Sequence, residues 1–99
     1  MNEIESKLKE LYNRIPRRHS ADNVKEIYNI LDELEDVLKT LEANADQEKE
    51  VAPYFDAIEP IRATTKKSND NKASKKTKDV LFDEASGMLK DTIEELMKL

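Results

Sequence analysis

The 99-residue chain has no cysteine, no tryptophan and a single glycine. Without cysteine there is no disulfide framework, thiolate metal site or cysteine nucleophile, which fits a reducing compartment. One glycine excludes the glycine-rich loops that cradle phosphates in P-loop and dinucleotide-binding proteins. With three prolines as well, the chain has few of the tight turns that β-hairpins need, so strands are disfavoured.

Long apolar runs are also missing. Nowhere do 18 consecutive apolar residues occur, and the opening MNEIESKLKEL is charged and has no apolar stretch typical of signal peptides. We therefore expect a cytoplasmic protein that does not cross a membrane. Its length leaves room for one domain, residues 1–99, with one modest core.

Apolar residues recur at helical spacing from the start of the chain. The spacing of Ile4, Leu8, Leu11 and Ile15 predicts a helix that Pro16 ends, because the residue before a proline is pushed out of the α region. Ser20 is placed to cap a second helix. That helix carries a heptad seam formed by Val24, Ile27, Leu31, Leu34, Leu38 and Leu41. We predict a break at 44–46, with continuation to about Ala52 as the alternative.

The third apolar face is interrupted by Pro53 and Pro60, which predicts a short or kinked helix. Tyr54 and Phe55 in it are expected to be the bulkiest core residues. The segment 63–78, ATTKKSNDNKASKKTK, has no large apolar residue and is predicted to be a basic flexible loop or linker.

A last helix is predicted from about Asp79 almost to Leu99. Its stripe consists of Leu81, Ala85, Met88, Leu89, Ile93, Leu96 and Leu99. Gly87 in its middle would allow another helix to approach closely.

These elements predict an all-α fold: a small antiparallel helical bundle of three long amphipathic helices and one short or kinked helix. The alternative is a coiled-coil-like helical hairpin dimer, in which the heptad seam packs against a second copy.

Catalytic patterns are missing. His19 is the only imidazole, it lies in an Arg-rich connection, and no HExxH or ExxH spacing accompanies it. Ser86 and Gly87 lack the glycine pattern of a nucleophile elbow. Acidic pairs such as Asp32–Glu33 fit a solvated helix face. We therefore expect no enzyme, no metal and no cofactor.

Two surfaces are candidates for binding. Apolar residues in excess of what a small bundle can hide favour a protein partner, and the candidates are Ile30, Val37, Leu38 and Met97. They support the leading hypothesis, a non-enzymatic protein–protein interaction module that acts as a binding, inhibitory, immunity-like or scaffold protein through an apolar helix face.

The second surface is basic. Residues 62–78 contain seven Lys or Arg and one Asp, giving +6, which leaves −11 for the rest of a chain with net charge −5. The candidate anion-binding residues are Arg17, Arg18, Lys66, Lys67, Lys72, Lys75, Lys76 and Lys78. They carry the alternative function, binding of nucleic acid or an anionic membrane surface, although no aromatic residue interleaves with the lysines to stack bases.

The motif ELYNRI at 10–15, together with the order of four helices, resembles the cytosolic immunity proteins that protect producers of pediocin-like bacteriocins. The resemblance implies a helical protein with an immunity role. It rests on six residues and on helix order, so it transfers no site residue to this chain.

Overall fold

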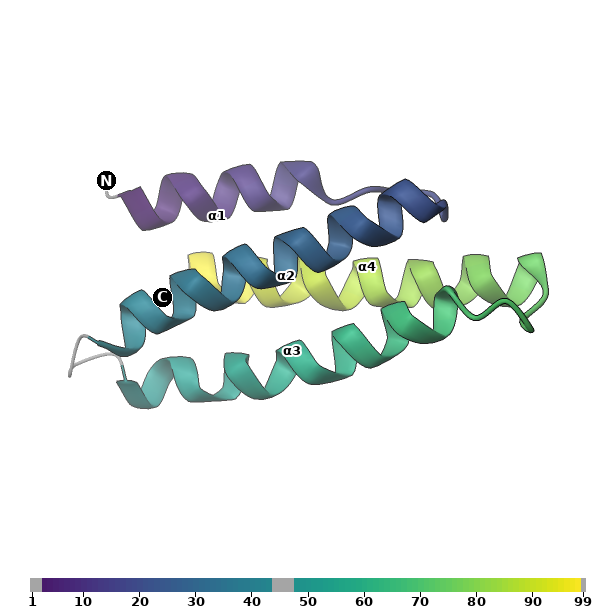
Figure 1. Cartoon of the computed structure of the whole chain (residues 1–99). Coiled ribbons are helices and arrows are strands. Elements are labelled where there is room, and N and C mark those ends of the chain that lie inside the picture. The colour runs from purple at the N-terminus through teal and green to yellow at the C-terminus, as the bar shows by residue number, and fades with distance from the viewer. Residues whose placement is uncertain (1–2, 44–47, 99) are drawn as a thin grey trace.

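The computed structural model of the chain describes residues 3–43 and 48–98. Within them lie α1 (Glu3–Arg14), α2 (Ala21–Glu42), α3 (Glu48–Ser68) and α4 (Lys75–Met97), and no strand. Successive helices run in opposite directions, and α1 closes the bundle by packing against both α2 and α4 (Figure 1). The predicted all-α bundle is thereby confirmed.

The first two helices follow the sequence closely. α1 ends at Arg14, two residues before Pro16, and buries Leu8 and Leu11. Ser20 caps α2, its hydroxyl accepting a hydrogen bond from the backbone N–H of Asn23 at 3.1 Å. The predicted break at 44–46 lies outside the described residues, between the end of α2 and the start of α3.

All six residues of the heptad seam of α2 are buried. α2 packs between α1 and α3, so its seam is covered within the chain. This use of the seam favours the bundle over the coiled-coil hairpin dimer, because a residue buried in its own core cannot also pack against a second copy.

The third helix was predicted wrongly to be short, since α3 spans 21 residues and passes through both prolines. Pro53 and Pro60 are both exposed, and so are Lys49 and Asp56, whose carbonyl groups lose the N–H partners that the prolines lack. Val51, Ile58 and Ile61 are buried on the opposite side of α3.

The structure also corrects the prediction that residues 63–78 form a loop. Residues 63–68 complete α3 and residues 75–78 begin α4, which leaves a six-residue connection, 69–74. Thr65 and Ser68 are fully buried although they are polar. Their hydroxyl groups donate to the carbonyl oxygens of Ile61 (2.7 Å) and Thr65 (2.6 Å), so burial leaves them satisfied.

The largest buried side chain is Phe82 of α4, which the predicted stripe of this helix omitted. Tyr54 and Phe55, expected to be the bulkiest core residues, are only half-buried against the core. None of the helices in the described ranges combines the length and low polarity needed to span a bilayer.

Truncation of the seam tests the core. Leu31 is 0% exposed, so Leu31→Ala should lower the free energy of unfolding by about 2–5 kcal/mol, from lost burial and the cavity left behind. Val80, which is 58% exposed, provides the control, since Val80→Ala should change stability by less than about 0.5 kcal/mol. Urea unfolding followed by circular dichroism measures both, and equal effects would contradict the assignment of the core.

Gly87 does not provide the close helix approach predicted from the sequence, because a Cβ atom added there would meet nothing within 4 Å. Gly87→Ala should therefore raise the free energy of unfolding by about 0.5–1 kcal/mol, since alanine loses less backbone entropy in a helix. Thermal unfolding measures the gain. A lower melting temperature would show that the space above Gly87 is needed.

Candidate functional site

The apolar candidates for partner binding belong mostly to the core. Ile30 and Leu38 are 0% exposed and Val37 is 8% exposed, while Met97 is half-buried against the core. The predicted exposed apolar face therefore does not exist at these positions, because the four-helix arrangement buries more of α2 than a hairpin would. The large hydrophobic residue that is exposed, among those described, is Val80.

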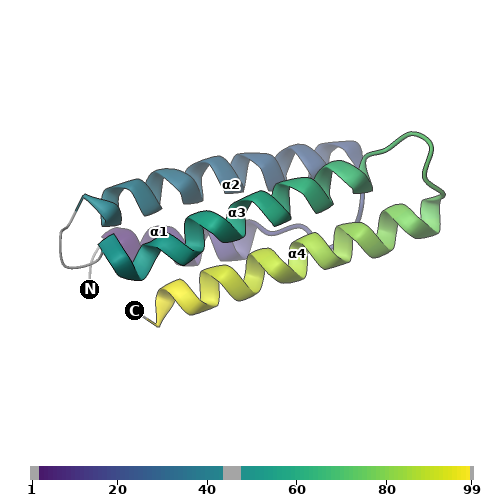
Figure 2. The same cartoon turned by 90° about the horizontal axis from the view of Figure 1, so that it is seen from below.

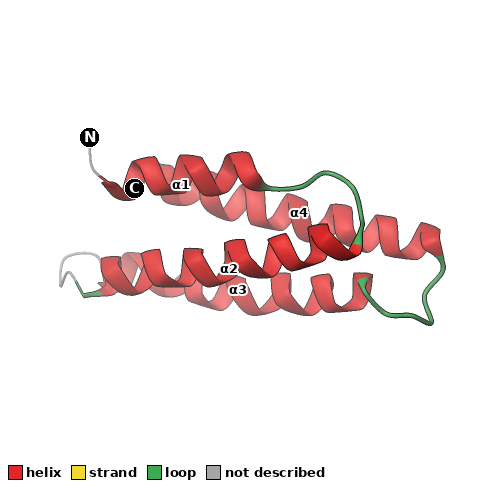
Figure 3. Ribbon diagram, turned by 45° about the horizontal axis from the view of Figure 1, so that its top comes forward, coloured by secondary structure: helices red, strands yellow, loops and turns green. Residues whose placement is uncertain are grey.

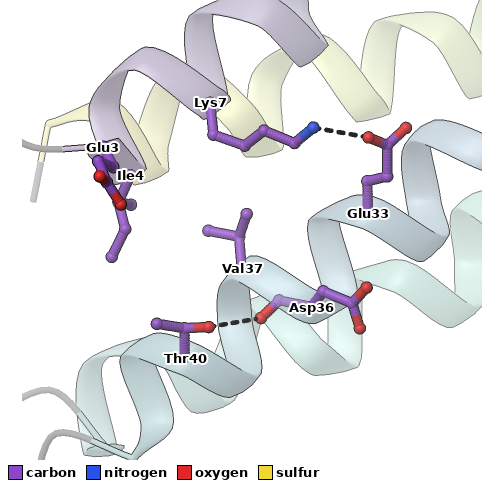
Figure 4. A pocket seen from close by; sticks show the side chains of 7 residues that line it. All are labelled: Glu3, Ile4, Lys7, Glu33, Asp36, Val37 and Thr40. Atoms are coloured by element: carbon purple, nitrogen blue, oxygen red, sulfur yellow. Dashed lines mark hydrogen bonds and ion pairs between the residues drawn. The ribbon is translucent and has the colours of Figure 1, made fainter.

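Val37 does reach a groove between α1 and α2 of about 440 Å³ (Figure 4). It faces Ile4 across the groove, and Lys7 closes one end with an ion pair to Glu33. The hydroxyl of Thr40 donates to the carbonyl oxygen of Asp36 at 3.1 Å. Lys7, Glu33 and Thr40 are thus already paired, and Ile4 and Val37 give the groove a small apolar floor.

An ion-pair network joins α1 to α2. Glu33 receives Lys7 Nζ at 2.6 Å on one carboxylate oxygen and Arg14 Nη2 at 2.7 Å on the other. Arg14 also contacts Glu26 at 2.8 Å. Hydrogen bonds from Arg14 and then from Lys7 lower the pKa of Glu33 to about 2, and the two carboxylates raise the pKa of Arg14.

The sequence pattern missed this network. Two ion pairs within α1 have the i,i+4 spacing that a sequence pattern can reveal, Lys9–Glu5 at 3.6 Å and Arg14–Glu10 at 3.3 Å. Lys7, however, contacts Glu33 and Glu10. A pair of residues 26 positions apart leaves no spacing signal within a single helix.

Arg62, the first residue of the basic stretch 62–78, also has a structural use. It bridges α3 to α2 by contacting Asp32 at 2.9 Å and Glu35 at 3.7 Å. Arg62 is therefore neutralised within the chain and does not add to the basic surface.

The eight candidate anion-binding residues gather at one end of the bundle, which we call the basic end. Arg17 and Arg18 lie in the 15–20 connection, and the six lysines lie in the last turn of α3, the 69–74 connection and the first turn of α4. Both connections join the helices at the same end, opposite the end at which α2 stops and α3 begins (Figure 3). None of the eight side chains forms an ion pair within the described ranges.

The first turns of α4 extend beyond the other helices at the basic end (Figure 2). α1, α2 and α3 begin with acidic residues, as the positive end of a helix dipole favours, but the first turn of α4 has no acid and carries Lys75, Lys76 and Lys78. Ser74 caps α4 by accepting from the N–H of Thr77 at 3.2 Å. The lysines are therefore held on an ordered helix in spite of unfavourable local electrostatics.

The 15–20 connection crosses α4 at this end, because α1 is shorter than the other helices (Figure 3). The hydroxyl of Ser86 donates to the carbonyl oxygen of Pro16 at 3.3 Å, and the ring of His19 meets Phe82 edge-on at 5.7 Å. Asn23 Nδ2 donates to the carbonyl oxygen of Arg18 at 2.7 Å. The backbone that carries Arg17 and Arg18 is thus held by contacts with α4 on one side and by a hydrogen bond from α2 on the other.

A groove of about 420 Å³, the basic-end groove, lies between this connection and α4. Its lining consists of Arg17, Arg18, His19, Lys75, Asp79 and Asp83. The Nε2 atom of His19 is buried and has no hydrogen-bond partner among the described residues. The groove therefore combines three cations with two carboxylates, brought together from positions about 60 residues apart in the chain.

A second groove at the basic end, of about 490 Å³, lies beside the end of α3. It is lined by Tyr28, Lys66, Lys67, Asn69, Asp70 and Asn71. Here too an acid, Asp70, stands among the lysines. In the described parts of the chain no three His, Asp or Glu side chains are close enough to hold a metal ion.

Comparison of the chain with known protein families, with curated proteins and with solved structures gives no match in any of the three.

The network around Glu33 predicts a pH dependence of stability. In the folded protein the pKa of Glu33 is about 2, below its ordinary value of 4.5. The stability that Glu33 contributes is therefore complete above pH 4.5 and is lost as the pH falls through about 2. Glu33→Gln should cost on the order of 1 kcal/mol at pH 7, because the partners are partly exposed, and nothing near pH 2. Urea unfolding across this pH range measures the difference. The exposed Glu59→Gln is the control, and a constant cost at all pH values would contradict the ion-pair origin.

Proposed function

We propose that the chain is a non-enzymatic protein-interaction module that docks through its basic end onto an acidic surface of a partner protein. One observation carries the proposal: eight cations that form no ion pair with the described residues lie together at one end of the bundle, in two connections and the adjoining turns of α3 and α4. Binding, inhibitory, immunity-like and scaffold proteins all belong to this class. A cytoplasmic setting is part of the proposal, since a chain without cysteine fits a reducing compartment.

The proposal keeps the class of function expected from the sequence and changes the surface. Ile30 and Leu38 are fully buried, so an apolar face built on them is not available to a partner. Val80 supplies an exposed apolar side chain one turn of α4 beyond Lys76. A partner that covers the first turns of α4 would therefore meet lysines and one apolar contact.

A protein partner fits the basic end better than nucleic acid or a membrane. Asp70, Asp79 and Asp83 stand among the cations of the two grooves and would repel a continuous row of phosphates. The aromatic rings that line the two grooves are those of His19, which packs against Phe82, and Tyr28, and both residues are half-buried, so stacked bases would find little support. Among the described residues, the large apolar side chain exposed at the basic end is that of Val80, which is too little to enter a bilayer. Protein surfaces, by contrast, commonly present both charges.

Charge also sets the direction of docking. The chain measures 45 Å along its longest axis, and its charge outside 62–78 is −11. An acidic partner therefore repels the flanks and the far end of the bundle and attracts the basic end. We infer an end-on approach, strongest at low ionic strength, because the Debye length is about 10 Å at 0.1 M salt.

Binding of an oligoglutamate peptide, measured by fluorescence anisotropy at several salt concentrations, tests the basic end. The triple variant Lys75→Gln, Lys76→Gln, Lys78→Gln should weaken binding roughly 3- to 100-fold, since each lost ion pair contributes about 0.2–1 kcal/mol. The control triple Lys39→Gln, Lys49→Gln, Lys98→Gln changes the net charge equally at the opposite end and should have little effect.

Two outcomes would contradict the proposal. Equal weakening by both triples would show that net charge alone determines binding. Tighter binding to duplex DNA or to anionic phospholipid vesicles than to the peptide, at the same salt concentration, would instead support the alternative function in nucleic-acid or membrane binding.

A further inference from the structure

We propose that the basic-end groove binds a peptide segment of mixed charge, with a carboxylate between Arg17, Arg18 and Lys75 and a cationic side chain against Asp79 and Asp83. This inference rests on the proposed function and goes further by naming the charge pattern of the partner. His19 takes no part in this binding, because its Nε2 atom is shielded from solvent.

The α4 side of the groove is an ordered stripe of charge. Lys75, Asp79 and Asp83 are spaced four residues apart, which places them on one face of the helix, and all three line the groove. Lys75 forms no ion pair with Asp79 in the described structure. Both signs of charge are therefore available to a ligand.

The opposite side of the groove supplies the arginines. Guanidinium groups match a carboxylate with two parallel hydrogen bonds, and the fastened backbone of the 15–20 connection limits the entropy lost when they bind. The chain's other two arginines, Arg14 and Arg62, are already paired with carboxylates. Arg17 and Arg18 are thus the arginines left to bind a ligand.

The aspartates of the groove favour a carboxylate over a phosphoryl group. Three permanent cations share the groove with two carboxylates, so a bound anion lies close to Asp79 and Asp83 as well as to the cations. A ligand carboxylate brings one negative charge near the aspartates, whereas a phosphoryl dianion brings two and is repelled more strongly. These two aspartates in turn require a donor, which a lysine or arginine of the same peptide provides.

The helix sets the spacing of the charges in the peptide. Asp79 and Asp83 lie about 6 and 12 Å from Lys75 along the axis of α4, at about 1.5 Å per residue. An extended peptide advances about 3.3 Å per residue. An acidic and a basic residue two to four positions apart would therefore reach both halves of the groove.

Two synthetic peptides of identical composition test this inference. One carries Glu and Lys two residues apart, and the other carries them eight residues apart on the same neutral background. We expect the close-spaced peptide to bind about 3- to 30-fold more tightly in calorimetry. Arg17→Gln with Arg18→Gln should weaken it by a similar factor.

The aspartates separate this site from general attraction to the basic end. Asp79→Asn with Asp83→Asn should remove the preference for the close-spaced peptide and strengthen binding of oligoglutamate about 2- to 10-fold, since two repulsive charges disappear. The control, Asp56→Asn with Asp91→Asn, removes two exposed acids outside the groove and should leave the preference unchanged. All of these positions are exposed, so circular dichroism should show an unaltered fold.

The outcomes distinguish this inference from the proposed function. If the lysine triple weakens peptide binding but spacing and the aspartate variants have no effect, the mixed-charge site is wrong and end-on docking stands. Displacement of the close-spaced peptide by equimolar inorganic phosphate would also overturn the carboxylate assignment. If no peptide binds at low salt, both proposals are wrong.

Discussion

The short connections between helices are the constraint on which the rest of the structure depends. α2 has 22 residues and is about 33 Å long, whereas a six-residue connection extends at most about 20 Å. Such a connection is too short to span the length of a helix, so each helix begins near the end of the previous one. Neighbouring helices are therefore antiparallel. The first and third connections must then lie at the same end. The apolar faces of four such helices close a core, and the cations of two distant segments become one surface.

The early end of α1 shapes that surface. Pro16 stops a helix that packs only Leu8 and Leu11 fully into the core, so α1 depends more than the other helices on polar contacts. Its ion pairs with α2 and the hydrogen bond from Tyr12 to Glu94 of α4 (2.7 Å) supply them. Beyond Arg14 the 15–20 connection takes the place of a helix over Phe82, and the basic-end groove forms along its edge. The surface on which the proposed function depends thus forms because α1 is shorter than the other three helices.

Helix existence and the core face of α2 could be predicted from the sequence, since regular apolar spacing and the Ser20 cap are local properties. The errors have two causes. Prolines end helices on average, yet α3 continues through Pro53 and Pro60 because both are exposed, while Ile58 and Ile61 are buried on the other side. The segment 63–78 has no large apolar residue, yet its first six residues are helical, and the buried hydroxyl groups of Thr65 and Ser68 donate to carbonyl oxygens of their own helix. Tertiary packing overrode propensity in each case.

For the candidate site, too, some features could be predicted from the sequence and others depend on the tertiary structure. The sequence by itself determined the all-α class, the eight cations and their separation from an acidic remainder, because composition and periodicity are carried by neighbouring residues. Only the tertiary structure decided that Ile30 and Leu38 are core, that Arg62 is neutralised, and that Arg17 lies beside Lys75. A predicted loop of 16 residues could have reached either end of the bundle, so the meeting of the two basic segments became certain only once α3 ended at Ser68 and α4 began at Lys75.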